Sequence, residues 1–237
     1  MQQSESFVDA VVLHSRPFQE DNALCELFTA QHGRLAGVVK KVRGRKSSKK
    51  ALIQPFQGVS VKWRGRGELK TFTHIEAASE LSVFLQGKAA LCGLYVNELM
   101  VRLLRPFDPH PDLFVDYLRC LSALKEAENV ELPLRIFESA LLQELGYAPD
   151  WSCHSVTGEP LEADGFYHYD PQQGIIDAPL NPFPKVQAAI FLGASLLGIA
   201  TQDYSEVTTL KDAKRLMRIA LQAQLGGKPL QSRKLFT

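Results

Sequence analysis

The amino-acid sequence predicts an α+β protein, because two different hydrophobic patterns divide it near residue 80. Before this point, apolar residues occur in short runs separated by turn residues, which is typical of β-strands. After it, they recur every three or four residues, which is typical of amphipathic helices. A length of 237 residues accommodates two domains, and we expect one at residues 1–80 and the other at 81–237.

Five short strands are predicted in the first domain. Residues 31–34 and 64–67 have the composition of tight turns, and the run from Leu69 to Ile75 alternates between apolar and polar side chains. The stretch from Lys40 to Lys50 has no apolar periodicity, so we expect a mobile loop there. Five strands with long connections in about 80 residues predict a small closed β-barrel of the OB type.

The second domain is predicted to be mainly α-helical. Residues 89–104 are apolar on most helical faces, which indicates a helix buried within a bundle. The next helix is expected to begin at an Asp112 N-cap behind Pro111. A third is expected to run from Pro133 to Gly146.

The rest of the second domain combines loops with two further helices. Residues 147–184 are rich in proline and glycine and predict a loop-rich insertion, with a small hairpin near 166–176. Helices are expected at 186–200 and 206–225. The last helix places four cations on one face and apolar residues on the other, which favours an anionic ligand such as DNA or an acidic peptide. These cations are Lys211, Lys214, Arg215 and Arg218.

The charge distribution points to nucleic acid. The net charge is only +1, but residues 34–70 contain twelve basic residues and a single acidic one. Such a segment presents a positive field to a polyanion while the whole chain stays near neutral. The candidate phosphate-binding residues are Arg34, Lys40, Lys41, Arg43, Arg45, Lys46, Lys49, Lys50, Arg64, Arg66 and Lys70. Lys62 alone is expected to matter little.

Aromatic side chains near these cations could stack on bases. Trp63 and Phe72 are the candidates, although residues such as Phe56, Trp63 and Phe72 more often form the core of a barrel. The sequence leaves this choice open, with the core interpretation favoured.

Several classes of protein are disfavoured by the sequence. No segment has the length and apolarity of a membrane span, so we expect a cytoplasmic protein. The four cysteines form no CxxC pair, and Cys153, His154 and His168 match no metal-ligand spacing. Motifs for nucleotide binding and for the commoner hydrolases are absent. We therefore expect a binding protein that is not an enzyme and uses no cofactor or metal.

Several segments together resemble the RecO family of bacterial DNA repair proteins. In the first domain they are Ala10–Pro17, Gly33–Leu35 and Gln54–Phe56. In the second they are Gly93–Leu99, Leu134–Glu138 leading to Leu145–Tyr147, and Gly226–Leu230 followed by Ser232 and Arg233. The resemblance covers nearly the whole chain. It implies an OB barrel followed by a helical domain.

The resemblance also implies a function. Members of this family are recombination mediators that bind single- and double-stranded DNA, anneal complementary strands, and work with RecR to load RecA onto DNA covered by single-strand-binding protein. A nucleoid-associated protein in the cytoplasm is implied. Some members hold zinc with four cysteines after the LGY motif, but only Cys153 lies in residues 147–184 here, so zinc is not expected.

The implied contact with single-strand-binding protein uses the acidic, apolar-ended tail of that protein. Such a tail requires a hydrophobic groove with cations at its rim. The candidate rim cations in the helical domain are Arg102, Arg105, Arg135, Lys214 and Arg215.

Two other functions remain open. A general RNA-binding barrel protein, such as a ribosome-assembly factor, would use the same basic loop. A nuclease with scattered acidic residues and a divalent metal is a weaker alternative.

Overall fold

The computed structural model describes residues 6–42 and 48–236, which divide into two compact units. Unit 1 comprises residues 1–130 and 230–237, and unit 2 comprises residues 131–229. The helices between residues 81 and 130 therefore belong to the same compact unit as the barrel, and the later α-helices belong to unit 2.

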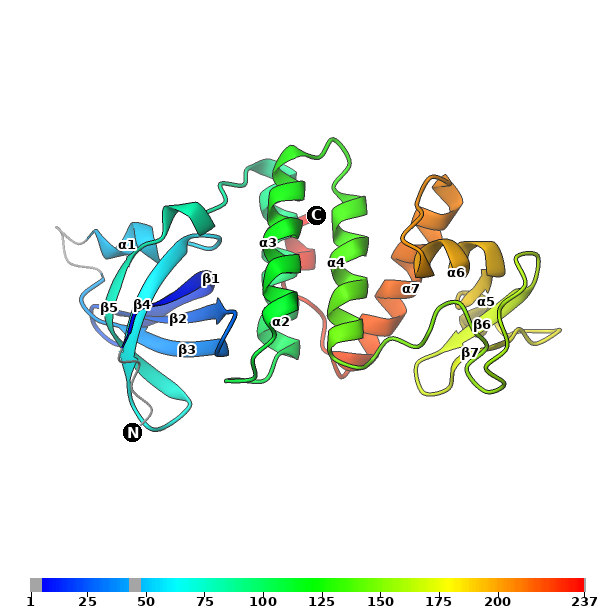
Figure 1. The fold of residues 1–237 in the computed structure, drawn as a ribbon, viewed down its shortest axis with the longest axis horizontal. Coiled ribbons are helices and arrows are strands. Elements are labelled where there is room, and N and C mark those ends of the chain that lie inside the picture. Colours follow the sequence, from blue (N-terminus) through cyan, green and yellow to red (C-terminus); the bar gives the residue numbers. More distant parts are fainter. Residues whose placement is uncertain (1–5, 43–47, 237) are drawn as a thin grey trace. The chain divides into compact units, whose positions relative to one another are not determined.

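The first five strands of unit 1 close into a β-barrel (Figure 1). They pair in the order β1-β2-β3-β5-β4, and β4 returns to β1. All neighbouring pairs are antiparallel except β3 and β5, which are parallel. The strands are β1 (Val8–Phe18), β2 (Asn22–Thr29), β3 (Gly33–Val39), β4 (Gly58–Arg64) and β5 (Leu69–Ala77). The prediction of an α+β protein with an N-terminal five-stranded OB-type barrel is confirmed.

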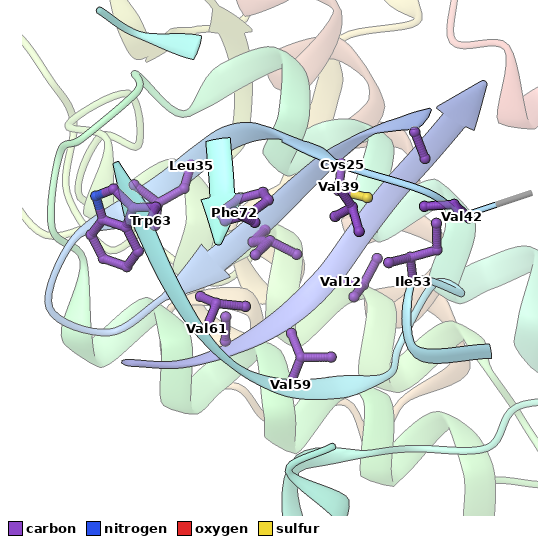
Figure 2. Packing of buried hydrophobic residues seen from close by; sticks show 13 residues of the cluster. Val12, Cys25, Leu35, Val39, Val42, Ile53, Val59, Val61, Trp63 and Phe72 are labelled. Carbon is purple, nitrogen blue, oxygen red and sulfur yellow. The ribbon is translucent and has the colours of Figure 1, made fainter. Parts of the chain in front are cut away.

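Alternate side chains of these strands point inward and fill the barrel (Figure 2). Trp63 and Phe72 are among them, with exposed fractions of 5% and 4%. Phe56 is also buried. The interpretation of these three aromatic residues as core is confirmed, and none of them presents a ring to a base. The members of the core are Ala10, Val12, Ala23, Cys25, Leu27, Leu35, Val39, Val42, Ile53, Val59, Val61, Trp63 and Phe72.

Two helices of unit 1 pack against the outside of the barrel. Helix α2 (Gly87–Leu103) contacts β1, and helix α3 (Pro111–Glu126) contacts β2. The ring of Phe28 on β2 lies 5.4 Å from the ring of Phe114 and 6.1 Å from that of Tyr117, both on α3. The outer face of β1 and β2 is therefore partly covered by these two helices.

A buried polar side chain connects the barrel to both helices. Asn97 on α2 donates a hydrogen bond from Nδ2 to the carbonyl oxygen of Leu13 at 2.7 Å. Its Oδ1 accepts a hydrogen bond from the hydroxyl of Tyr117 at 2.8 Å. The pairing of β1 with β2 shifts register between Val12 and His14, which leaves the Leu13 carbonyl outside the regular ladder. Asn97 satisfies it.

The start of α3 differs from the prediction. Its N-cap is His110, and Pro111 occupies the first turn. Proline suits this position because its missing N–H would have no partner inside the helix. Asp112 consequently lies in the first turn, where its negative charge complements the helix dipole. The prediction of Asp112 as N-cap was wrong by two residues.

The chain end returns to unit 1. The carboxylate of Glu98 on α2 accepts hydrogen bonds from the backbone N–H groups of Gln231 and Ser232, both at 2.8 Å, and from the Ser232 hydroxyl at 2.6 Å. These bonds begin the short helix η2 (Ser232–Phe236). The other short elements of unit 1 are α1 (Lys49–Leu52) and η1 (Ser79–Leu81).

Unit 2 combines helices with a small sheet of order β7-β6-β8. The predicted hairpin near residues 166–176 is confirmed by the pairing of β6 with β7. The elements are α4 (Glu131–Glu144), β6 (Phe166–Asp170), β7 (Gly174–Asp177), α5 (Pro184–Gln187), β8 (Ile190–Leu192), α6 (Gly193–Ala200) and α7 (Val207–Gln224). Across the described parts of the chain, no helix is both long and apolar enough to span a membrane.

The prediction of one helix over residues 186–200 was wrong. Residues 190–192 form β8, which pairs with β6, and the helical segments on either side are α5 and α6. A short apolar run fits either a buried strand or a helix, so its own pattern does not decide between them. Pairing with the edge of β6 makes residues 190–192 a strand.

Candidate nucleic-acid interface

Five of the predicted phosphate-binding side chains are exposed on the barrel of unit 1, and a sixth is half-buried. The exposed ones are Lys40, Lys41, Lys50, Arg64 and Arg66, and the half-buried one is Lys49. The predictions for Arg43, Arg45 and Lys46 lie outside the described residues. Arg34 and Lys70 are in a different environment.

Arg34 is used inside unit 1. Its guanidinium forms an ion pair of 2.7 Å with Glu26 on the neighbouring strand, and its Nε donates to the carbonyl oxygen of Leu104 at 3.1 Å. Only 14% of its side chain is exposed. This geometry joins β3 to the segment after α2, and it leaves little of the charge for an external ligand.

Lys70 is almost completely buried, with an exposed fraction of 1%. Its ammonium donates to the carbonyl oxygen of Gly65 at 3.2 Å and lies 4.4 Å from the centre of the Phe107 ring. A buried ammonium is costly unless it has such partners. Phe107 follows α2 in the chain, so sequence alone could not indicate that it would cover a residue of β5.

Outward-facing cations follow strand β4, where Arg64 and Arg66 are exposed and Lys62 is half-buried. Because Val61 and Trp63 point into the barrel, Lys62 and Arg64 point outward, and Arg66 follows in the turn to β5. We call Lys62, Arg64 and Arg66 the β4 stripe. In the described part of the chain, none of the three forms an ion pair with a carboxylate. Their charge is therefore available to a phosphate.

A second group of cations surrounds the connection from β3 to α1. We call Lys40, Lys41, Lys49 and Lys50 the α1 patch. Its members are kept together in part by a hydrogen bond of 3.2 Å from the Lys49 ammonium to the carbonyl oxygen of Lys40.

The barrel register relates the α1 patch to the β4 stripe. Val39 pairs with Phe72, and Phe72 pairs with Trp63. Lys40 directly follows Val39 at the end of β3, and Lys62 precedes Trp63 on β4, so β5 alone separates the two positions. Strands lie about 4.8 Å apart, which places the two backbones roughly 10 Å from each other. One polyanion can contact both groups.

An exposed aromatic ring adjoins the β4 stripe. Phe7, immediately before β1, is 41% exposed. The ammonium of Lys62 lies 4.5 Å from the centre of its ring, and the ring of His74 on β5 lies 6.2 Å away in an edge-to-face arrangement. Neither Phe7 nor His74 was predicted as a binding residue from the sequence, and Lys62 alone was expected to matter little. The three side chains lie together because Lys62 pairs with His74 and Val8 pairs with Val61. These pairings between strands exist only in the folded barrel.

The cations proposed for an acidic peptide are divided between the units. In unit 1, Arg105 is exposed, whereas Arg102 lies 3.8 Å from the carboxylate of Glu98. In unit 2, Arg135 is buried on α4 and forms an ion pair of 2.9 Å with the equally buried Glu138. The prediction that Arg135 lies at the rim of a groove was wrong, because its position on α4 faces the interior of the unit.

The two remaining candidates lie on α7. Lys214 forms an ion pair with Glu131. Arg215 donates to the carbonyl oxygen of Ile190 at 2.6 Å and to Asp212 at 3.0 Å, and its guanidinium lies 4.3 Å from the centre of the Phe191 ring. Both side chains keep substantial exposure, of 57% and 40%. They can therefore contact a ligand while they keep their present contacts within unit 2.

The side chains that could support catalysis are buried or hydrogen-bonded within the fold. Burial raises the pKa of the Cys25 thiol to about 12, with a smaller contribution from the charge of Glu26. The Nδ1 atom of His154 accepts hydrogen bonds from the backbone N–H groups of Val156 and Thr157 and so forms part of a turn. Among the described residues, no cluster of three or more His, Cys, Asp or Glu side chains could hold a metal ion.

Comparison with known proteins decides the family. The family model described as "Recombination protein O N terminal" matches residues 1–80, and "Recombination protein O C terminal" matches residues 85–234. The chain belongs to the RecO family. Proteins named "DNA repair protein RecO" match it over nearly their whole length, including one from Pseudomonas paraeruginosa that is 44% identical over 95% of this chain and 92% of its own.

Other members of the RecO family give the same result. The DNA repair protein RecO of Pasteurella multocida is 41% identical and covers 98% of this chain and 95% of its own. The protein of the same name from Haemophilus influenzae strain 86-028NP is 40% identical, with 95% and 93% covered. The resemblance seen in the sequence is therefore confirmed, and both the barrel and the helical part of the chain match this family.

Proposed function

We propose that this protein acts in DNA repair as a recombination mediator that binds single- and double-stranded DNA through its barrel. The observation that carries the proposal is the β4 stripe beside the α1 patch, where exposed cations gather on one side of an OB-type barrel. Membership of a family whose relatives are named DNA repair proteins supports the biological role. Arg34 and Lys70 are left out of the proposed interface, because partners within unit 1 hold them.

The proposed action needs no chemical step. Two DNA strands repel each other through their phosphates, and bound cations release the counterions condensed on each strand. A barrel that neutralises phosphates of both strands lowers the cost of bringing them together. Complementary bases then pair without a nucleotide cofactor. We propose no catalytic residue, metal or cofactor for this action.

The proposed partners are single-strand-binding protein, RecR and RecA. In this proposal the acidic tail of single-strand-binding protein contacts unit 2 at Lys214 and Arg215, which keep exposed charge beside apolar residues of α7. Arg102 and Arg105 remain candidates in unit 1, and Arg135 is removed from the set because it is buried. The proposed place of action is the nucleoid in the cytoplasm, at single-stranded DNA from which RecA must displace the covering protein.

The test is an annealing assay with two complementary oligonucleotides that are precoated with single-strand-binding protein. EDTA is present, no nucleotide is added, and salt is varied. We expect rapid annealing that slows as salt rises. The variant Arg64→Glu/Arg66→Glu should anneal at least tenfold more slowly, and the salt dependence of its single-strand affinity should be shallower by about 1.4 in log–log slope for two lost contacts.

The matched control is Lys88→Glu, which reverses an exposed cation at the start of α2, away from the β4 stripe. It should anneal at the wild-type rate. If the Arg64→Glu/Arg66→Glu variant also anneals normally, the proposed interface is wrong. If the wild-type protein prefers structured RNA to both DNA forms, the RNA-binding alternative replaces the DNA repair role.

A further inference from the structure

The ring of Phe7 is exposed and lies outside the core of the barrel, among the residues that the structure describes. It precedes β1, contributes nothing to the barrel core, and keeps 41% of its surface in solvent. Among the described residues, its ring contacts the side chains of Lys62 and His74. An aromatic ring beside a cation on an open strand surface is the arrangement that single-strand-binding proteins use for base stacking.

We propose that Phe7 is a base-stacking platform for single-stranded DNA, supported by Lys62 and His74. The inference rests on the proposed function, which supplies the nucleic acid, and adds the position at which an unpaired base is bound. Trp63 and Phe72, the aromatic candidates from the sequence, are buried in the barrel and cannot serve. Phe7 is the exposed aromatic side chain that adjoins the β4 stripe.

The geometry assigns separate tasks to the ring and the cations. Lys62 holds its ammonium 4.5 Å from the centre of the Phe7 ring, where the phosphate next to a stacked base requires a counter-charge. Arg64 continues the outward-facing row on β4, one side-chain repeat of about 6.7 Å further along. A strand whose base stacks on Phe7 can therefore place successive phosphates along the β4 stripe.

The occupant is single-stranded DNA because only unpaired bases offer a free face. In a duplex each base is stacked on both sides, and the cations contact the backbone alone. An apolar partner protein would instead require a continuous hydrophobic surface, whereas Phe7 is flanked by Lys62, His74 and the exposed Asp9. Phe7 should thus contribute to single-strand affinity and not to duplex affinity.

The experiment measures the affinity of the full chain for a fluorescent oligothymidine and for a duplex of equal length, over a salt series. Phe7→Ala should weaken oligothymidine binding roughly 5- to 150-fold, the range for loss of one base–aromatic stack, with an unchanged salt slope. Duplex affinity should remain within twofold of wild type. Phe7→Trp should bind oligothymidine as tightly as wild type, and the fluorescence of the new indole should be quenched when oligothymidine binds.

The control is Phe84→Ala, which removes a ring that is 69% exposed in the same unit but contacts no other ring or cation among the described residues. It should bind both DNA forms as wild type does. Circular dichroism and the thermal midpoint establish that each variant is folded.

Three results would refute the stacking role of Phe7. They are unchanged oligothymidine affinity in Phe7→Ala, an equal loss of affinity for single strand and duplex, and weaker oligothymidine binding by Phe7→Trp than by wild type. In each case the effect of the Arg64→Glu/Arg66→Glu variant still tests the proposed function separately. If wild-type protein binds neither DNA form, the proposed function itself fails.

Discussion

Replacing Asn97 by leucine should weaken the attachment of the barrel to the helices that pack on it. Asn97 is 2% exposed and is bonded on both sides, to the Leu13 carbonyl of β1 and to the Tyr117 hydroxyl of α3. Leucine has a similar volume but can make neither bond. The change therefore removes two buried hydrogen bonds while it preserves most of the packing.

The magnitude follows from those two bonds. A buried polar group that loses its partner costs about 1–3 kcal/mol, and here one carbonyl and one hydroxyl each lose one. We expect the free energy of unfolding of unit 1 to fall by about 2–6 kcal/mol. Burial raises the pKa of the Tyr117 hydroxyl well above its usual range, so this group stays a neutral donor at any ordinary pH.

The assay is urea unfolding followed by the fluorescence of Trp63, which lies in the barrel core. The variant Trp151→Phe provides the background, because it removes the tryptophan of unit 2. Asn97→Leu, Tyr117→Phe and the double variant form a thermodynamic cycle. A coupling of at least 0.5 kcal/mol between the two positions is expected. A loss below 1 kcal/mol for Asn97→Leu, or strict additivity in the cycle, would refute the bridging role.

Two further predictions concern Glu98 and Gly37. Partial burial alone would raise the pKa of Glu98, but the hydrogen bonds from Ser232 and Gln231 and the charge of Arg102 outweigh it and lower the pKa below its usual value. The bonds thus stabilise the fold above the unfolded pKa of about 4.3, and the stability difference between wild type and Glu98→Gln should vanish as pH falls from 5 through the folded pKa in urea titrations. A Cβ atom on Gly37 would lie 2.4 Å from the Phe72 ring, so Gly37→Ala should lower the unfolding free energy by about 1–3 kcal/mol, and adding Phe72→Leu should recover part of it; equal stability of Gly37→Ala and wild type in urea would contradict this.

The local patterns of the sequence were sufficient for the elements of the barrel. A strand with one face in the core must alternate, so the run that includes Val59, Val61 and Trp63 was recognisable without knowing its partners. The alternation of Leu69, Thr71 and Thr73 also identified a strand, but the buried face of β5 carries Lys70 and Phe72 instead. The helical period of α3 was equally clear, because one apolar stripe faces the interior. Where a segment was short and uniformly apolar, as at residues 190–192, the pattern could not decide, and the edge of β6 made it a strand.

The site depended on the tertiary structure. Composition located a basic segment, but Arg34, Lys70 and Arg64 carry the same positive charge and differ only in what the folded chain places beside them. Lys70 is covered by Phe107, which is far from it in sequence.

The sequence by itself determined that this protein has an OB-type barrel, a helical part and a cation-rich segment, since each follows from patterns within a few neighbouring residues. Only the tertiary structure decided which cations reach solvent and that Phe7 lies beside Lys62 and His74. The reason is that strand register and the covering of one face by another segment are set by contacts between residues distant in the chain.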